Sequence, residues 1–174
     1  MIGECGRRGG YYEAVNIDEA VMAQLLKLAS MAVDVMVNPP RPGDASYEQY
    51  TQEVDAIFQS MKRRAKKLAE AFNSLPNMTC NDAQGAMYLF PKVEFPQAFV
   101  DEAKALGQSP DGLYCMQMLE ATGISVVPGS GFGQVPGTFH FRSTFLPQEH
   151  LFDDFIGGFK KFHLSFLARY SPNL

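Results

Sequence analysis

One arginine in an apolar, strand-like segment is the residue of this chain best suited to chemistry. Arg142 lies in the sequence FHFRST at positions 139–144. A strand of this kind is normally half buried, and a guanidinium there needs a partner. The planar fork of arginine fits a carboxylate through two hydrogen bonds. An internal aspartate or glutamate is the commoner partner, and the acid group of a bound substrate is the alternative. His140 is expected to share a face with Arg142, where a structural histidine is commoner than a catalytic one.

Two glycine-rich segments could bring backbone close to a ligand. In GRRGG at 6–10, Arg7 or Arg8 could add charge-assisted bonds to a phosphate, although a solvated basic turn is the simpler reading. The segment GSGFG at 129–133 lacks the last glycine of a dinucleotide fingerprint, because Gln134 follows it and no helix start comes after. It predicts a turn that brings backbone close to a ligand or to another strand.

Composition excludes several classes of partner. The chain has 174 residues and a net charge of −4, so one domain, or one domain plus a piece of another, is expected without a nucleic-acid footprint. No segment is apolar enough to predict a membrane span. Three distant cysteines without a C-x-x-C pair, and three histidines without ligand spacing, predict neither disulfides nor a metal site. A reducing compartment, cytoplasmic or organellar, fits best.

Proline and capping patterns divide the chain. Residues 11–15 predict a strand, and Asn16 with Glu19 as its capping-box partner predicts a helix to about Asp34. The sequence NPPRPG at 38–43 cannot continue a helix or form a central strand. We therefore expect a domain boundary, with residues 1–45 on one side and residues 46–174 on the other.

The second part predicts an α/β domain with two layers. A long helix from Ser46 is followed by two strands, two helices, two strands and a last helix of about twenty residues. The two strands are expected at 78–81 and 86–91, the helices from Pro96 to about Gly107 and from Ser109 to Gly123, the next strands at 124–127 and around Arg142, and the last helix from Pro147.

Five segments in order resemble one enzyme family. They are GECGRRGGY at 3–11, NPPRPG at 38–43, QGAMY at 84–88, VPGSGFG at 127–133 and FHFRST at 139–144. Together they resemble the alanine aminotransferases, which are fold type I enzymes dependent on pyridoxal phosphate. The resemblance implies that residues 46–174 form the two-layer small domain of such an enzyme. Residues 1–45 would then be a remnant strand and helix of the large, cofactor-binding domain.

The resemblance also implies roles for single residues. Arg8 matches the arginine that binds the cofactor phosphate, and Arg142 matches the arginine that holds the α-carboxylate of the substrate. Residues 38–40 match a stretch near the second subunit of the family homodimer. Four further residues match positions that shape the substrate pocket, namely Gly85, Tyr88, Gly131 and Phe132.

The family reaction transfers the amino group of alanine to 2-oxoglutarate and gives pyruvate and glutamate. The resemblance places the Schiff-base lysine four residues before the glycine that matches Gly3, which is beyond Met1, and other cofactor contacts further upstream. We therefore expect a C-terminal fragment that is inactive alone, with the apolar surface of residues 1–34 exposed. The rival hypothesis is a non-catalytic α/β interaction domain or a self-associating fragment.

Overall fold

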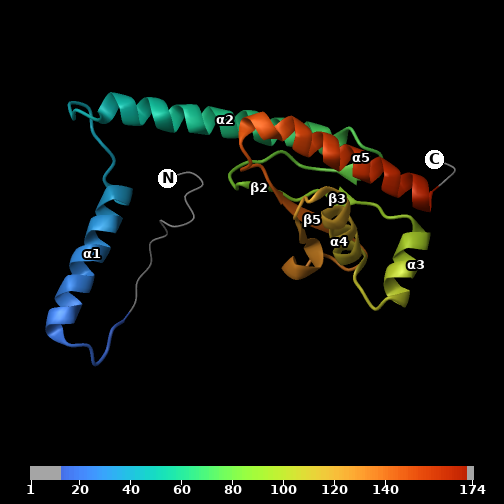
Figure 1. Cartoon of the computed structure of the whole chain (residues 1–174), viewed down its shortest axis with the longest axis horizontal. Coiled ribbons are helices and arrows are strands. Elements are labelled where there is room, and N and C mark those ends of the chain that lie inside the picture. The colour runs from blue at the N-terminus through green and yellow to red at the C-terminus, as the bar shows by residue number, and fades with distance from the viewer. Residues whose placement is uncertain (1–12, 172–174) are drawn as a thin grey trace. The chain divides into compact units, whose positions relative to one another are not determined.

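The computed structural model describes residues 13–171, apart from the side chains at positions 32, 33, 35 and 36. The chain divides into two compact units, Met1–Gln59 and Ser60–Leu174, and each is described by itself. Figure 1 shows the elements along the chain. Helix α2 (Tyr47–Asn73) begins one residue after the predicted Ser46.

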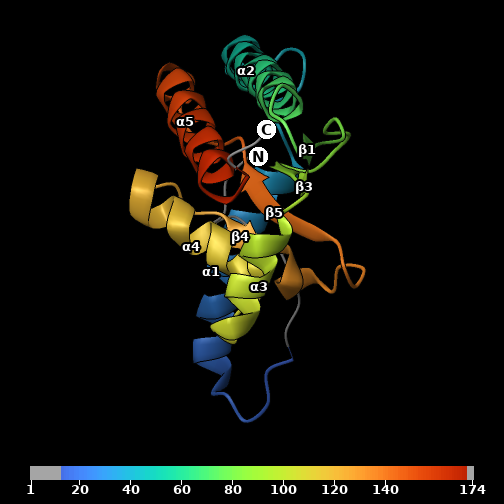
Figure 2. The same ribbon diagram turned by 90° about the vertical axis from the view of Figure 1, so that its right-hand side faces the viewer.

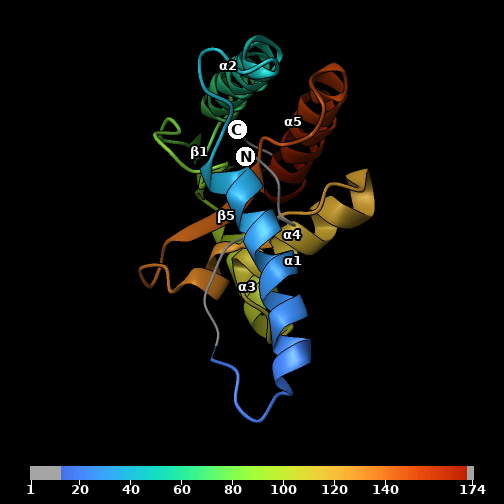
Figure 3. The same ribbon diagram turned by 90° about the vertical axis from the view of Figure 1, so that its left-hand side faces the viewer.

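The described part of the first unit contains α1 (Glu19–Val37), an unbroken helix shown in blue in Figure 3. Its cap is Asp18 and not Asn16 as predicted: an Asp18 carboxylate oxygen accepts from the backbone N–H groups of Ala20 and Val21 at 2.9 and 3.3 Å. Asn16 instead adopts a left-handed backbone with φ of 59°. The predicted strand at 11–15 is wrong for residues 13–15, which form none, and its first two residues lie outside the described chain.

Helix α1 carries apolar side chains that its own unit does not cover. Val21 is 51% exposed and Leu28 is 68% exposed, as expected for this surface. Even so, none of the helices formed by the described residues is long and apolar enough to cross a membrane.

The second unit follows the predicted order of elements, with one strand divided. Its strands are β1 (Met78–Thr79), β2 (Tyr88–Leu89), β3 (Lys92–Val93), β4 (Val127–Pro128) and β5 (Phe139–Thr144). Its helices are α3 (Gln97–Ala105), α4 (Pro110–Thr122) and α5 (Phe152–Tyr170), with short 3-10 turns η1 (Gly129–Phe132) and η2 (Glu149–Leu151). The caps predicted for α4 are confirmed, because the Ser109 hydroxyl accepts from Gly112 N and Gly123 ends the helix with φ of 73°.

The small sheet is antiparallel and centred on β5. Strands β2 and β3 lie along one edge of β5 in a single register, with Tyr88 opposite Thr144 and Val93 opposite Phe139. Strand β4 lies along the other edge and β1 pairs with β3. The buried strand predicted at 124–127 is wrong, since only Val127–Pro128 pairs and Val127 is 39% exposed. Among the described residues β4 pairs only with β5, so its other edge has no strand neighbour.

One face of β5 forms the core. Side chains alternate along a strand, and Phe141 and Ser143 point to the helices. The Phe141 ring lies 5.6 Å from that of Phe72 in α2 and 5.8 Å from that of Phe159 in α5. Helices α4 and α5 lie side by side (Figure 2), and Tyr114 of α4 also packs on Phe141.

A buried histidine shows how polar groups are satisfied in this core. The Nε2 atom of His163 lies 2.8 Å from the carbonyl oxygen of Pro76, which can only accept, so Nε2 carries the hydrogen. Nδ1 then accepts from the Tyr114 hydroxyl at 2.8 Å. Burial lowers the pKa of His163. His163 is therefore a neutral, structural residue.

Candidate functional site

The other face of β5 carries the candidate site. His140 and Arg142 alternate with the core residues and so lie on this opposite face, as the sequence predicts. Tyr88 and Phe90 join them from the neighbouring strand segment, and Phe132 joins from the turn η1. We call these five residues the Arg142 face.

The guanidinium of Arg142 is positioned by two rings. Its central carbon lies 4.5 Å from the ring centre of Tyr88 and 4.8 Å from that of Phe132. Cation–π contacts of this kind restrain the group but use none of its five N–H donors. Within residues 13–171, no carboxylate or other acceptor is hydrogen-bonded to Arg142. The described structure thus contains no internal ion pair for it, and the donor fork can receive a carboxylate.

His140 is held on the same face. Its ring stacks on Phe90 at 4.9 Å and 5°, and its Nδ1 atom lies 3.1 Å from the side-chain oxygen of Gln134. Partial burial lowers the pKa of His140, the charge of Lys92 lowers it further, and Asp111 acts in the opposite direction. The imidazole is therefore neutral near pH 7, with Nδ1 bonded inside the protein.

The turn η1 sits unusually close to β5. A Cβ atom added at Gly129 would lie 2.8 Å from the carbonyl oxygen of His140, so only glycine fits there. The backbone N–H of Ser130 donates to a carboxylate oxygen of Asp111 at 2.5 Å. The predicted close approach of this turn to another strand is confirmed, and it places Phe132 against Arg142.

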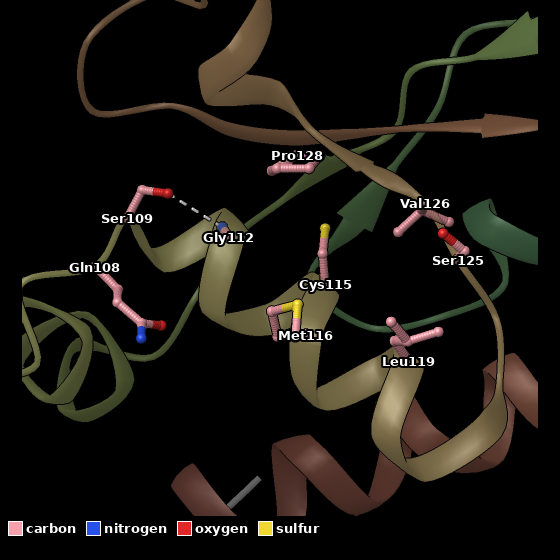
Figure 4. A pocket seen from close by; sticks show the side chains of 9 residues that line it. All are labelled: Gln108, Ser109, Gly112, Cys115, Met116, Leu119, Ser125, Val126 and Pro128. Carbon is pink, nitrogen blue, oxygen red and sulfur yellow. Dashed lines mark hydrogen bonds between the residues drawn. The ribbon is translucent and has the colours of Figure 1, made fainter.

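A separate cavity of about 420 Å³ lies between α4 and β4. Figure 4 shows Cys115, Met116 and Leu119 of α4 on one side, and Val126 and Pro128 on the other. No charged side chain lines it. Burial, and then the charge of Asp111, raises the pKa of the Cys115 thiol to about 12, so this thiol is not a nucleophile at neutral pH. Apart from Gln108, Ser109 and Ser125, the side chains that line the cavity are apolar or thiol groups.

The described residues can also be compared with what a cofactor phosphate or a metal ion would need. Arg7 and Arg8 lie outside the described residues, so the phosphate contact stays a prediction. Among the described residues, no three His, Cys, Asp or Glu side chains are grouped to hold a metal. The ammonium of Lys92, opposite His140 in the sheet, is bonded to Glu94 at 3.0 Å. The guanidinium of Arg142, between two rings and without an acceptor among the described residues, has the geometry to bind a carboxylate.

Sequence reasoning missed three residues of this region. Phe90 could have been found, because it stands two positions after Tyr88 in the same strand-like segment and so shares its face. Gln134 was noted only as a departure from a glycine pattern. Asp111 looks like an ordinary acid in the first turn of a helix, and nothing in the sequence links it to positions about twenty residues later.

Comparison with known proteins identifies the family. The family model "Aminotransferase class I and II" matches residues 6–151. Alanine aminotransferase 2 of Panicum miliaceum is 48% identical over 178 residues, which cover 97% of this chain and 37% of that protein. Glutamate–glyoxylate aminotransferase 2 of Arabidopsis thaliana is 45% identical over 181 residues, which cover 98% of this chain and 38% of that protein. The chain thus spans less than two fifths of either relative.

Solved structures agree on the fold. An alanine aminotransferase from Pyrococcus furiosus superposes with a TM-score of 0.58 at 24% identity, covering 84% of this chain and 34% of that one. At such identity the likeness concerns the fold alone. It shows that the mixed α/β structure, with its small sheet, resembles part of a fold type I aminotransferase, as the sequence predicts. Since the family model matches residues 6–151, well over half of this chain, the chain belongs to the aminotransferase class I and II family of pyridoxal-phosphate-dependent transaminases.

Proposed function

We propose that this chain is the C-terminal part of an alanine aminotransferase, and that its Arg142 face binds the carboxylate of the amino-acid or oxo-acid substrate. One observation carries the proposal: the described structure gives Arg142 two aromatic neighbours and no acceptor. Relatives named alanine aminotransferase at up to 48% identity support the reaction. The transfer then runs from alanine to 2-oxoglutarate.

The work of this face is binding and orientation. The two parallel donors of Arg142 grip both oxygens of the acid group, which fixes the rotation of the substrate about its Cα–carboxylate bond. Tyr88 and Phe132 keep the guanidinium from swinging and remove water from its faces. Positioning of this kind can supply a large part of a rate enhancement.

The residues that would bind the cofactor are not part of the Arg142 face. Pyridoxal phosphate, when bound, supplies the electron sink that makes the α-proton removable. We assign its phosphate contact to Arg8. We also propose that the chain alone does not turn over and that the whole protein is a homodimer. A cytoplasmic location stays a prediction, since some relatives are named mitochondrial, including one from Arabidopsis thaliana at 47% identity.

A second candidate is glutamate–glyoxylate transamination. Two Arabidopsis thaliana proteins with that name are 45% identical to the chain over 181 residues, nearly as similar as the alanine enzymes. Glyoxylate and pyruvate share the carboxylate and differ by one methyl group. Because Arg142 would bind the carboxylate of either oxo acid, binding alone does not separate the candidates. The ratio of the affinities for pyruvate and glyoxylate does.

Carboxylate binding by the 174-residue chain tests the proposal. We expect pyruvate to perturb the NMR signal of the Arg142 Nε–H group, while methyl pyruvate, which lacks the charged acid, leaves it unmoved. Arg142→Met should abolish pyruvate binding. Equal responses to acid and ester, or undiminished binding by the variant, would overturn the assignment and favour a non-catalytic interaction domain.

Turnover is tested separately. Mixed with pyridoxal phosphate, alanine and 2-oxoglutarate, the chain should produce no pyruvate above the level given by the free cofactor. Appreciable turnover would show that these residues hold a complete active site. Borohydride treatment would then reveal whether a lysine of this chain had bonded to the cofactor.

A further inference from the structure

Asp111 is a buried carboxylate outside the Arg142 face. It stands in the first turn of α4 and is only 2% exposed. One oxygen, Oδ2, accepts from the backbone N–H of Ser130 at 2.5 Å and from the amide nitrogen of Gln134 at 3.2 Å. The other, Oδ1, is buried without a hydrogen-bond partner among the described residues. A buried, half-satisfied carboxylate costs stability, so its presence calls for a reason beyond packing.

The two hydrogen bonds at Asp111 have fixed donors and acceptors, and these fix the direction of the next bond along the chain of contacts. An ionised carboxylate only accepts, so Gln134 must turn its NH₂ group toward Asp111. Its carbonyl oxygen then faces His140 and can only accept, so Nδ1 of His140 carries the hydrogen. In the neutral ring Nε2 is left as the acceptor nitrogen. The hydrogen bond from Gln134 to Asp111 thereby selects the tautomer of a residue on the Arg142 face.

The same carboxylate seats the turn η1. Ser130, which donates to Asp111, precedes Phe132 by two residues, and Gly129 lies against the backbone of β5 at His140. Phe132 in turn contacts the guanidinium of Arg142 and the ring of Phe90. Loss of the Asp111 anchor would therefore release one of the two rings that hold Arg142.

We propose that Asp111 is a positioning residue for the Arg142 face: through Ser130 it places Phe132 against the guanidinium, and through Gln134 it fixes the tautomer of His140. The inference rests on the proposed function of Arg142 as the carboxylate-binding residue. Asp111 itself touches neither Arg142 nor the space that the acid group would occupy. Its influence is carried by the turn and by the amide.

Two NMR signatures in the 174-residue chain test the role of Asp111 without requiring any ligand. The Arg142 Nε–H signal is displaced by the ring currents of Tyr88 and Phe132, and Phe132→Leu gives its value with one ring removed. The ¹⁵N shifts of the His140 ring report which nitrogen carries the hydrogen. We expect Asp111→Ala to move the Arg142 signal toward the Phe132→Leu value and to abolish the Nδ1–H tautomer. Asp111→Asn keeps one acceptor oxygen and should change both signals less.

A pyruvate titration forms the third measurement. Asp111→Ala should weaken pyruvate binding by about tenfold, equivalent to roughly 1.4 kcal/mol. Asp154→Asn is the matched control, because Asp154 is an exposed acid in the first turn of α5, and it should alter none of the three readouts. Gln134→Ala, at a half-buried site, should remove the tautomer preference even if Asp111→Ala does not fold.

The outcomes separate this inference from the function on which it rests. If wild-type chain fails to bind pyruvate while Asp111→Ala still shifts Arg142 and His140, the proposed function is wrong and the positioning role stands. If wild type binds pyruvate and Asp111→Ala leaves both signatures and the affinity unchanged, the positioning role is overturned. Unchanged His140 shifts in Gln134→Ala would also overturn the proposal that Asp111 fixes the His140 tautomer through Gln134.

Discussion

The two faces of β5 treat their polar groups in opposite ways. On the helix-covered face, His163 is completely buried and both ring nitrogens are bonded, one to a carbonyl and one to Tyr114. On the other face, Arg142 lies between two rings and has no acceptor among the described residues. The described structure thus satisfies both nitrogens of His163 internally and leaves the donor fork of Arg142 without an internal acceptor.

Two arginines make the same contrast. Arg64 is 8% exposed, and its guanidinium donates to the carbonyl oxygens of Ser60, Leu146 and Pro147, so it joins α2 to the segment before α5. Arg142 makes no such bond in the described chain. Arg64 therefore contributes to stability through internal hydrogen bonds, whereas the guanidinium of Arg142 contributes none within the described chain, as the proposed binding role requires.

The largest effect on the free energy of unfolding should come from removing a buried ring on the core face. Phe72 is fully buried and contacts the rings of Phe141 and Phe159, so Phe72→Ala should lower the free energy of unfolding by about 3–5 kcal/mol. Phe90, on the Arg142 face, is 42% exposed, and Phe90→Ala should cost about 1 kcal/mol. Urea denaturation of both variants measures the difference. Similar losses would mean that the two faces are equally buried.

The arginine pair should give the next effect. Arg64→Met removes the donor of the half-buried carbonyl oxygens of Leu146 and Pro147 and should cost roughly 2–3 kcal/mol of unfolding free energy. Arg142→Met removes no hydrogen bond within the described chain and should change stability by less than about 0.5 kcal/mol. Thermal denaturation of the two variants checks this. A loss for Arg142→Met as large as for Arg64→Met would reveal an internal partner.

A smaller effect is expected at the turn. Gly129→Ala places a methyl group against the backbone of His140, which must shift, at a cost of about 1–3 kcal/mol. The same shift should disturb the Arg142 Nε–H signal. Gly131→Ala is the control, because an added Cβ there meets nothing within 4 Å. If both variants behave alike, the turn is not seated by close packing.

Acidification should give the smallest effect, and His163 tests the part of it that comes from the core face. An unperturbed histidine titrates near 6.5, and burial lowers the pKa of folded His163. As the pH falls, the unfolded state therefore binds a proton at this histidine before the folded state does. The contribution of His163 to stability is complete above about pH 6.5 and is lost as the pH falls below that value. Between about pH 7 and about pH 5, wild-type stability should fall more steeply than that of His163→Gln. His150→Gln, at an exposed site, should keep the wild-type slope.

Local patterns predicted most of the second unit. The Ser109 cap, Pro110 in the first turn and the left-handed Gly123 fix α4 from neighbouring residues alone. Of the strand expected at 86–91, only Tyr88–Leu89 pairs, as β2, and β3 (Lys92–Val93) begins after the predicted end, because Pro91 between them has no N–H to donate to the ladder. In the first unit, Asn16 and Asp18 are both acceptable caps by sequence, and only the backbone shows that Asp18 is used.

The site was predicted where it depends on alternation and missed where it depends on tertiary contacts. Arg142 and His140 share a face because they are two residues apart in a strand. Asp111 reaches Gln134 across 23 positions and Ser130 across 19, so no short pattern could join them. The phosphate-binding role of Arg8 remains a prediction, because the described residues do not include it.

The most direct test of the account is a crystal structure of the chain grown with saturating 2-oxoglutarate. We predict that both oxygens of one carboxylate lie within hydrogen-bond distance of the Arg142 guanidinium, with Tyr88 and Phe132 still against its faces. An aspartate or glutamate of the chain paired with Arg142, or the oxo acid bound only elsewhere, would contradict the account.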